Sequence, residues 1–182
     1  MKKFALAAAV AVALPIVAAA PAHAATIYNE GPFCRYQLTR EELPALAMMK
    51  ASENARYYGL DQRETQAEYE WHLNDYTNNR MAADGFFYQV VPVSEEHAYV
   101  PKEGVGFASA MVPAGVRDYG DAVAGNLNWL QSECRAGRNS AVNLADPAPA
   151  VNAMNQGAPV WFSLSWLTRP LYQAMNSIGS SL

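Results

Sequence analysis

The first 24 residues constrain this chain more than any other part of it, because they predict where the remainder folds. Two lysines precede an apolar run over residues 4–17, and small residues then lead to Ala22-His23-Ala24. A positive start, an apolar centre and an A-x-A site are typical of a secretory signal peptide. The apolar run is shorter than the ~20 residues that cross a bilayer. We therefore expect cleavage after Ala24, no transmembrane span in the mature chain, and an exported product, periplasmic or secreted.

Removal of 24 of the 182 residues leaves a mature chain of 158 residues, a common size for one domain. We predict a single mature domain over residues 25–182. It keeps two cysteines, Cys34 and Cys134, and in an oxidising compartment two cysteines usually form one disulfide. The sequence has no C-x-x-C motif, so it offers no support for a thioredoxin-type redox site or for covalently attached haem.

The charge of the mature chain argues against two classes of partner. Loss of Lys2 and Lys3 changes the formal net charge from −4 to −6. An acidic domain repels a phosphate backbone, which disfavours nucleic-acid binding. It is repelled by an anionic membrane surface for the same reason.

Two helix starts follow each other closely. Thr39 with Glu42, and Asp61 with Glu64, form capping-box patterns, in which a capping residue is followed three positions later by glutamate. Apolar residues at helical spacing follow the first start, and Gly59 is a natural C-terminal stop. The connection of about three residues requires antiparallel neighbours. We predict an αα-hairpin over residues 39–85, with its second helix ending near residue 83, after an irregular lead segment over residues 25–38.

After residue 85 the residue pattern of the sequence changes. Residues 86–91 are aromatic and β-branched and favour a strand, within a short β region over 86–113 that is punctuated by prolines. Apolar residues then step by three and four, which predicts a central helix over 114–137. A connector and an aromatic C-terminal segment fill 138–182, with a turn-rich stretch over 139–159, an alternating strand over 160–167 and a terminal helix between 168 and 179. We expect a mainly α fold with a minor β component (α+β), in one compact domain.

The candidate site is a stripe on the second predicted helix. Glu64, Glu68, His72 and Asp75 are spaced by four, four and three, so they share one helix face. A carboxylate beside an imidazole raises its basicity, which suits a general base and makes Glu68, His72 and Asp75 candidate catalytic residues. Glu68 and His72 with His97, from a second acidic cluster, are candidate metal ligands. The alternative interpretation is a solvated acidic face.

Other chemical signatures are incomplete. No nucleophile elbow, S-x-x-K motif or glycine-rich phosphate loop is present in the sequence. We therefore expect a non-catalytic binding or interaction protein of the cell envelope, without a cofactor, whose partner is an unknown protein, glycan or small molecule. The alternative is a small exported hydrolase or metal-dependent enzyme that uses the stripe. The aromatic C-terminal segment is interpreted as core or as an exposed patch; its bulky residues are Trp161, Phe162, Trp166 and Tyr172.

Overall fold

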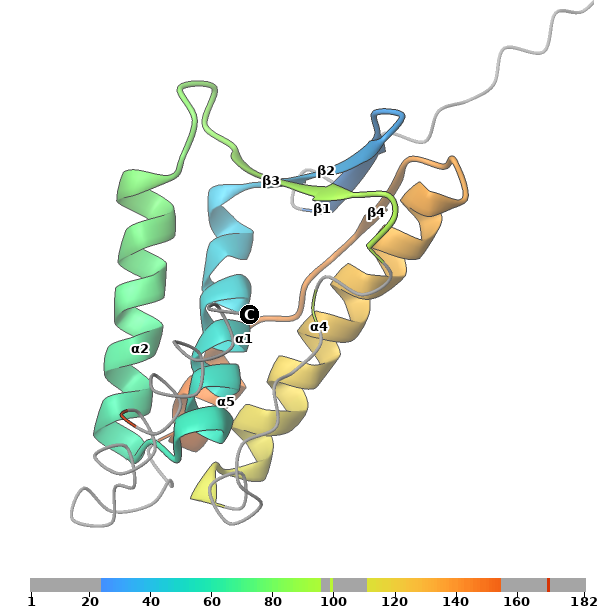
Figure 1. Cartoon of the computed structure of the whole chain (residues 1–182). Coiled ribbons are helices and arrows are strands. Elements are labelled where there is room, and N and C mark those ends of the chain that lie inside the picture. Colours follow the sequence, from blue (N-terminus) through green and yellow to red (C-terminus); the bar gives the residue numbers. More distant parts are fainter. Residues whose placement is uncertain (1–23, 96–98, 100–110, 155–169, 171–182) are drawn as a thin grey trace, which may run out of the picture.

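The computed structural model describes residues 24–95, 99, 111–154 and 170, and combines a four-stranded antiparallel sheet with helices (Figure 1). The sheet lies across one end of the three long helices. In chain order the elements are β1 (Ala25–Asn29), β2 (Phe33–Leu38), the 3-10 turn η1 (Arg40–Glu42), α1 (Leu43–Tyr58), α2 (Gln62–Asn74), the π-helical turn η2 (Asp75–Asn79), β3 (Phe87–Pro92), α4 (Ala114–Arg135), β4 (Ser140–Val142) and α5 (Ala148–Met154). This mixture of helix and sheet agrees with the α+β class.

The lead segment is ordered, which corrects the expectation of an irregular stretch over residues 25–38. β1 and β2 form an antiparallel hairpin, and the sheet order is β3-β2-β1-β4. The turn uses Gly31 at a φ of 75°, a left-handed conformation that favours glycine. Alternate residues of the hairpin then face the core, and Ile27, Tyr36 and Leu38 are buried.

α2 begins at its predicted capping box, whereas the capping box of Thr39 and Glu42 begins the 3-10 turn η1, and α1 follows that turn at Leu43. The Thr39 backbone N–H donates to Glu42 Oε2 over 2.8 Å, and the Glu64 backbone N–H donates to Asp61 Oδ1 over 2.8 Å. α1 ends at Gly59, whose φ of 67° is left-handed. The two helices contact each other along their length and run in opposite directions (Figure 1). Helical structure ends at Asn79 instead of residue 83, through the single π-helical turn η2.

The second half of the described chain adds the fourth strand to the sheet. α4 spans the residues whose steps of three and four predicted a helix, and Gly137 follows it at a φ of 78°. In the described part of the turn-rich stretch over 139–159, up to residue 154, the chain forms β4 and α5, which we did not predict. β4 pairs with β1, because the chain turns back beside the first strand after α4. The predicted strand over 160–167, the terminal helix and most of the region 100–112 lie outside the described residues.

The helices cover one face of the sheet. Tyr36 from β2 is buried there, and its hydroxyl donates to the carbonyl oxygen of Leu127 in α4 over 2.8 Å. The predicted disulfide is present: Cys34 in β2 is bonded to Cys134 at the end of α4, with 6.0 Å between their Cα atoms. Both cysteines are fully buried.

Within the described ranges, no helix combines the length and the apolar character needed to cross a membrane.

Candidate functional site

Two members of the predicted stripe come together, and the residue that joins them lies on the neighbouring helix. Asn54 of α1 donates from Nδ2 to Glu68 Oε2 over 2.8 Å and lies 3.3 Å from His72 Nε2. Glu68 Oε2 is 3.7 Å from the same imidazole nitrogen. The three side chains therefore form a polar cluster in the seam between α1 and α2, which we call the Asn54 cluster.

The other two members of the stripe have different partners. Glu64 completes the capping box of α2 by accepting the Asp61 backbone N–H over 3.1 Å. Asp75 is the first residue of the π-helical turn, and its Oδ2 lies 2.8 Å from Nε of Arg80, the residue that follows the turn. The catalytic set of Glu68, His72 and Asp75 is thus brought together only in part. His97, the third candidate metal ligand, lies outside the described residues.

Burial determines the chemistry of His72. Its side chain is 13% exposed, and Trp71 and Tyr76 pack against the ring with centroid distances of 4.8 and 5.7 Å. Burial lowers the pKa of His72, opposed by the nearby carboxylate of Glu68. The imidazole is therefore held in its neutral form at neutral pH, as a polar bridge between two helices.

We expect His72 to make stability fall with acidification. The pKa of His72 is lowered on folding, so the unfolded chain takes up this proton first, below its ordinary pKa of about 6.5. The charged groups around the ring are Glu68, Lys50, Asp75 and Arg80. Urea denaturation between pH 7 and pH 5 should show a steeper loss of stability for the wild type than for His72→Gln. An equal slope in both proteins, or a slope abolished only by His97→Gln, would contradict this assignment.

The described residues offer little support for a metal centre. No group of three or more His, Cys, Asp and Glu side chains lies close enough to hold a metal ion in this part of the protein. Glu68 also lines a wide, open depression on α2, together with Glu64, Ala67 and Trp71. His72 does not line this depression, so the imidazole and the open surface are separated.

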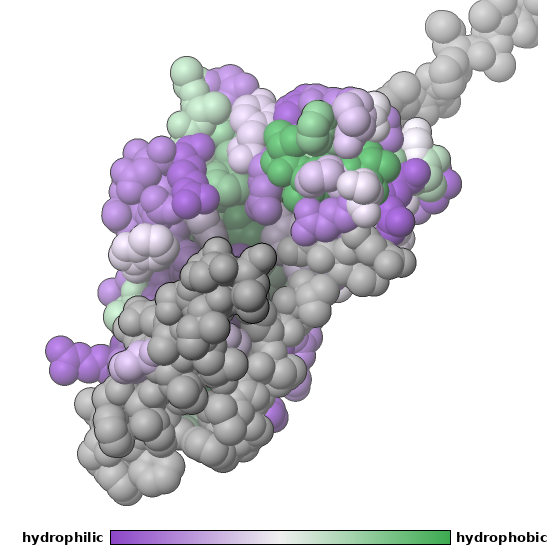
Figure 2. Space-filling model, viewed as in Figure 1, coloured by the Kyte–Doolittle hydropathy of each residue, from purple (hydrophilic) through white to green (hydrophobic). Residues whose placement is uncertain are grey.

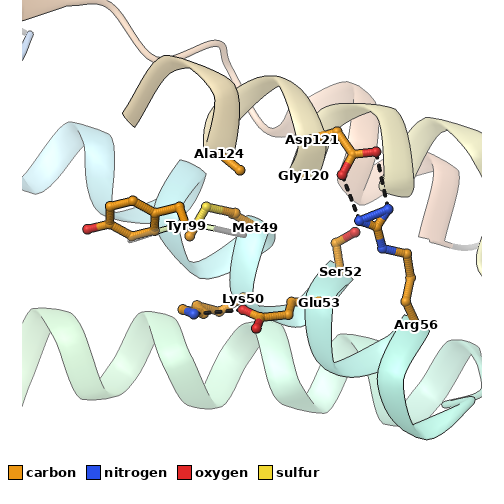
Figure 3. Close-up of a pocket in the computed structure, with 9 residues that line it drawn as sticks. All are labelled: Met49, Lys50, Ser52, Glu53, Arg56, Tyr99, Gly120, Asp121 and Ala124. Carbon is orange, nitrogen blue, oxygen red and sulfur yellow. Dashed lines mark hydrogen bonds and ion pairs between the residues drawn. The ribbon is translucent and has the colours of Figure 1, made fainter. Parts of the chain in front are cut away.

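A second polar site lies between α1 and α4 (Figure 3). Arg56 is buried with a side chain 6% exposed, and its guanidinium reaches across to Asp121 in two contacts of 2.6 and 3.1 Å. Ser52 points toward Gly120, and its buried hydroxyl makes no hydrogen bond within the described residues. The pocket has space for about one water molecule. This site can hold a structural water but not an organic substrate.

A further group of accessible side chains, which sequence reasoning missed, lies on the outer face of the sheet. Arg35 of β2 lies between two tyrosine rings, with its Cζ 5.0 Å from the centroid of Tyr28 and 4.9 Å from that of Tyr88. Phe33 and Val90, on the neighbouring strands β2 and β3, are 46% and 54% exposed. In Figure 2 an apolar area is visible at the sheet end of the molecule. We call these five residues the outer face.

The sequence carried one signal for the outer face. Phe33, Arg35 and Gln37 alternate with buried Cys34, Tyr36 and Leu38, which is the two-residue period of a half-buried strand. This alternation does not predict which residues of the neighbouring strands lie beside Arg35. Tyr28 pairs opposite Arg35 only because β1 and β2 form a hairpin, and Tyr88 arrives from β3.

Comparison of the chain with protein-family models, with curated proteins and with solved structures finds no match.

Proposed function

We propose that this chain is an exported, disulfide-bonded binding protein that recognises another protein of the cell envelope through its outer face. The observation that carries the proposal is the arrangement of Tyr28, Arg35 and Tyr88 beside exposed Phe33 and Val90. Tyrosine, phenylalanine and arginine are enriched at protein interfaces, where planar rings and a guanidinium give a large contact area. The helices lie on the opposite face of the sheet, so none of the described helices covers these residues.

Arg35 supports a partner that presents a carboxylate among apolar side chains. The guanidinium already pairs with Glu30 over 2.5 Å, and Glu30 is 45% exposed. An exposed ion pair of this kind contributes about 0–1 kcal/mol, so exchange of Glu30 for a partner carboxylate costs little. The two tyrosine rings restrict Arg35, which reduces the entropy lost when the partner binds.

Export supports this role by placing the chain where such a partner is found. The buried disulfide is typical of an oxidising compartment, and the first 24 residues have the order of a signal peptide. Mass spectrometry of the protein isolated from its native host should give an N-terminus at Ala25 and no free thiol. An intact Met1 with two free thiols would remove the proposal.

Site-specific photo-crosslinking tests the binding face. A photoreactive residue placed at Phe33 or at Val90 of the full-length chain, expressed in its native host, should capture the same protein. The matched control is Trp129 on α4, which is 47% exposed and thus as accessible as Phe33. With the purified partner, we expect Arg35→Ala to weaken binding about 30-fold, the effect of one interface hot spot, and Trp129→Ala to leave it unchanged.

Three results would contradict the proposal. Equal capture from Trp129 would show that the contact is not specific to the outer face. Capture of a second copy of this chain would replace the proposed partner by self-association. Unchanged affinity of Arg35→Ala would show that the captured protein does not use this surface.

A further inference from the structure

A buried carboxylate at the start of α1 lies beside the first residue of the predicted mature chain. Glu42 is 4% exposed. Its Oε2 atom accepts the Thr39 backbone N–H over 2.8 Å and lies 3.2 Å from the Thr39 hydroxyl. Its Oε1 atom is buried and has no hydrogen bond of good geometry within the described residues. One oxygen of this carboxylate is therefore left undersatisfied.

The residue that faces this carboxylate is Ala25. It is fully buried, and its backbone N–H lies close enough to Glu42 to favour the charged form of the carboxylate. Burial nevertheless dominates and raises the pKa of Glu42, helped by the neighbouring charge of Glu41. No lysine or arginine of the described residues forms an ion pair with Glu42. In the uncut chain, the described residues thus provide no compensating cation for this buried carboxylate.

We propose that Glu42 is the receptor for the α-ammonium group that forms at Ala25 when residues 1–24 are removed. The inference rests on the export proposed above. Hydrolysis of the peptide bond between Ala24 and Ala25 leaves the new carboxylate on Ala24, which departs with the leader, and the amine on Ala25. That amine takes up a proton at neutral pH, because an ordinary α-amino group has a pKa of about 7.7–8.0.

The chemical change suits the site. A peptide N–H is a single, uncharged donor, whereas an ammonium group presents three N–H donors and a full positive charge. It can satisfy Glu42 Oε1 while Thr39 continues to satisfy Oε2. A buried charge is tolerated when it is paired and hydrogen-bonded, and is strongly destabilising when it is left alone.

Burial of the cleavage site requires that cleavage happens before the protein has finished folding. Ala24 is 5% exposed and Ala25 is 0% exposed, so a peptidase cannot reach the bond between them in the folded protein. Cleavage must precede incorporation of β1 into the sheet. The precursor is thereby less stable in its folded form than the processed chain, because processing supplies a cation that none of the described side chains supplies to Glu42.

The experiment compares two changes, made separately and together, in the exported and processed protein. One is Glu42→Gln. The other is a glycine inserted between Ala24 and Ala25 of the precursor, which moves the new ammonium group one residue away from Glu42. With the natural N-terminus, Glu42→Gln leaves a buried ammonium group unpaired, and we expect the folding equilibrium constant to fall about 100-fold. With the inserted glycine, Glu42 has no cation to lose, and we expect the same substitution to leave the constant unchanged or raise it.

A second readout does not depend on the Glu42→Gln variant being folded. Acylation at pH 7 should modify the α-amine of the glycine-extended protein at least 10-fold faster than that of the natural protein. Mass spectrometry locates the N-terminus in each sample. A natural N-terminus other than Ala25 overturns the inference together with its premise of processing. A correct N-terminus with equal effects of Glu42→Gln in both backgrounds, or with equal acylation rates, overturns the pairing alone.

Discussion

Replacement of both cysteines by alanine should lower the free energy of unfolding by about 4 kcal/mol. Cys34 and Cys134 are 100 residues apart, and in the chain-entropy model a loop of that size corresponds to about 4.7 kcal/mol. Measured disulfides usually contribute 2–4 kcal/mol, so we take a value near the upper end of that range. Since a domain unfolds with about 5–15 kcal/mol, the loss should be a large part of the total.

Urea denaturation of the oxidised wild type, the reduced wild type and the double variant measures this effect. The reduced wild type and the double variant should unfold at similar urea concentrations, and dithiothreitol should not change the double variant. Asn29 donates two hydrogen bonds at the same junction: its side-chain Nδ2 donates to the Cys134 carbonyl oxygen over 2.7 Å, and its backbone N–H donates to Asn139 Oδ1 over 2.9 Å. A change below about 1 kcal/mol on reduction would show that these bonds maintain the junction without the disulfide.

Gly120→Ala should lower the free energy of unfolding by about 2 kcal/mol, whereas Gly125→Ala on the same helix should raise it. A Cβ atom at Gly120 would lie 2.7 Å from Ser52 Oγ and 2.8 Å from Ser52 Cβ, closer than real contacts allow. Overpacking of a well-packed contact costs about 1–3 kcal/mol. Gly125 has no atom within 4 Å of an added Cβ, so alanine there should contribute up to about 1 kcal/mol through its helix propensity.

A compensating change separates close packing from other effects at this site. Ser52→Gly removes both atoms that the new methyl group would meet, so we expect it to recover part of the stability lost in Gly120→Ala. The two residues are in contact, and their effects should therefore be non-additive. Thermal or urea unfolding of the single and double variants gives the coupling. Equal stability of Gly120→Ala and Gly125→Ala would show that α1 and α4 can separate at this crossing without cost.

Local patterns in the sequence predicted local structure well. Steps of three and four placed α4, and the two capping boxes placed the starts of the helical segments that follow Thr39 and Asp61. These signals work because a helix satisfies its own backbone within a few residues. The disulfide was predictable for a different reason, because two cysteines in an oxidising compartment allow a single intramolecular pairing.

The sheet was less accessible because its strands pair over long distances in the chain. Residues 25–29 look irregular in isolation, since Ala25 and Ile27 become one side of a strand only when β2 and β4 lie beside them. β4 is three residues long and carries no periodic signal of its own. Its existence follows from α4 ending beside β1.

The candidate site shows the same limit at the level of side chains. Helical spacing put four residues on one stripe, but two of them bind elsewhere. Glu64 accepts a hydrogen bond from the Asp61 backbone, and Asp75 forms an ion pair with Arg80. Asn54, which joins Glu68 to His72, comes from the other helix and has no special context in the sequence. Whether side chains meet across a seam depends on helix packing, which single-sequence patterns do not encode.

The position of β1 between β2 and β4 has a consequence during translation. A ribosome releases the chain from its N-terminus, so β1 and β2 emerge long before α4 and β4. Until then one edge of β1 has no native neighbour, and the thiol of Cys34 has no native partner. The nascent protein therefore cannot acquire its final covalent form during most of its synthesis, and an oxidant that meets it early finds a single reactive sulfur.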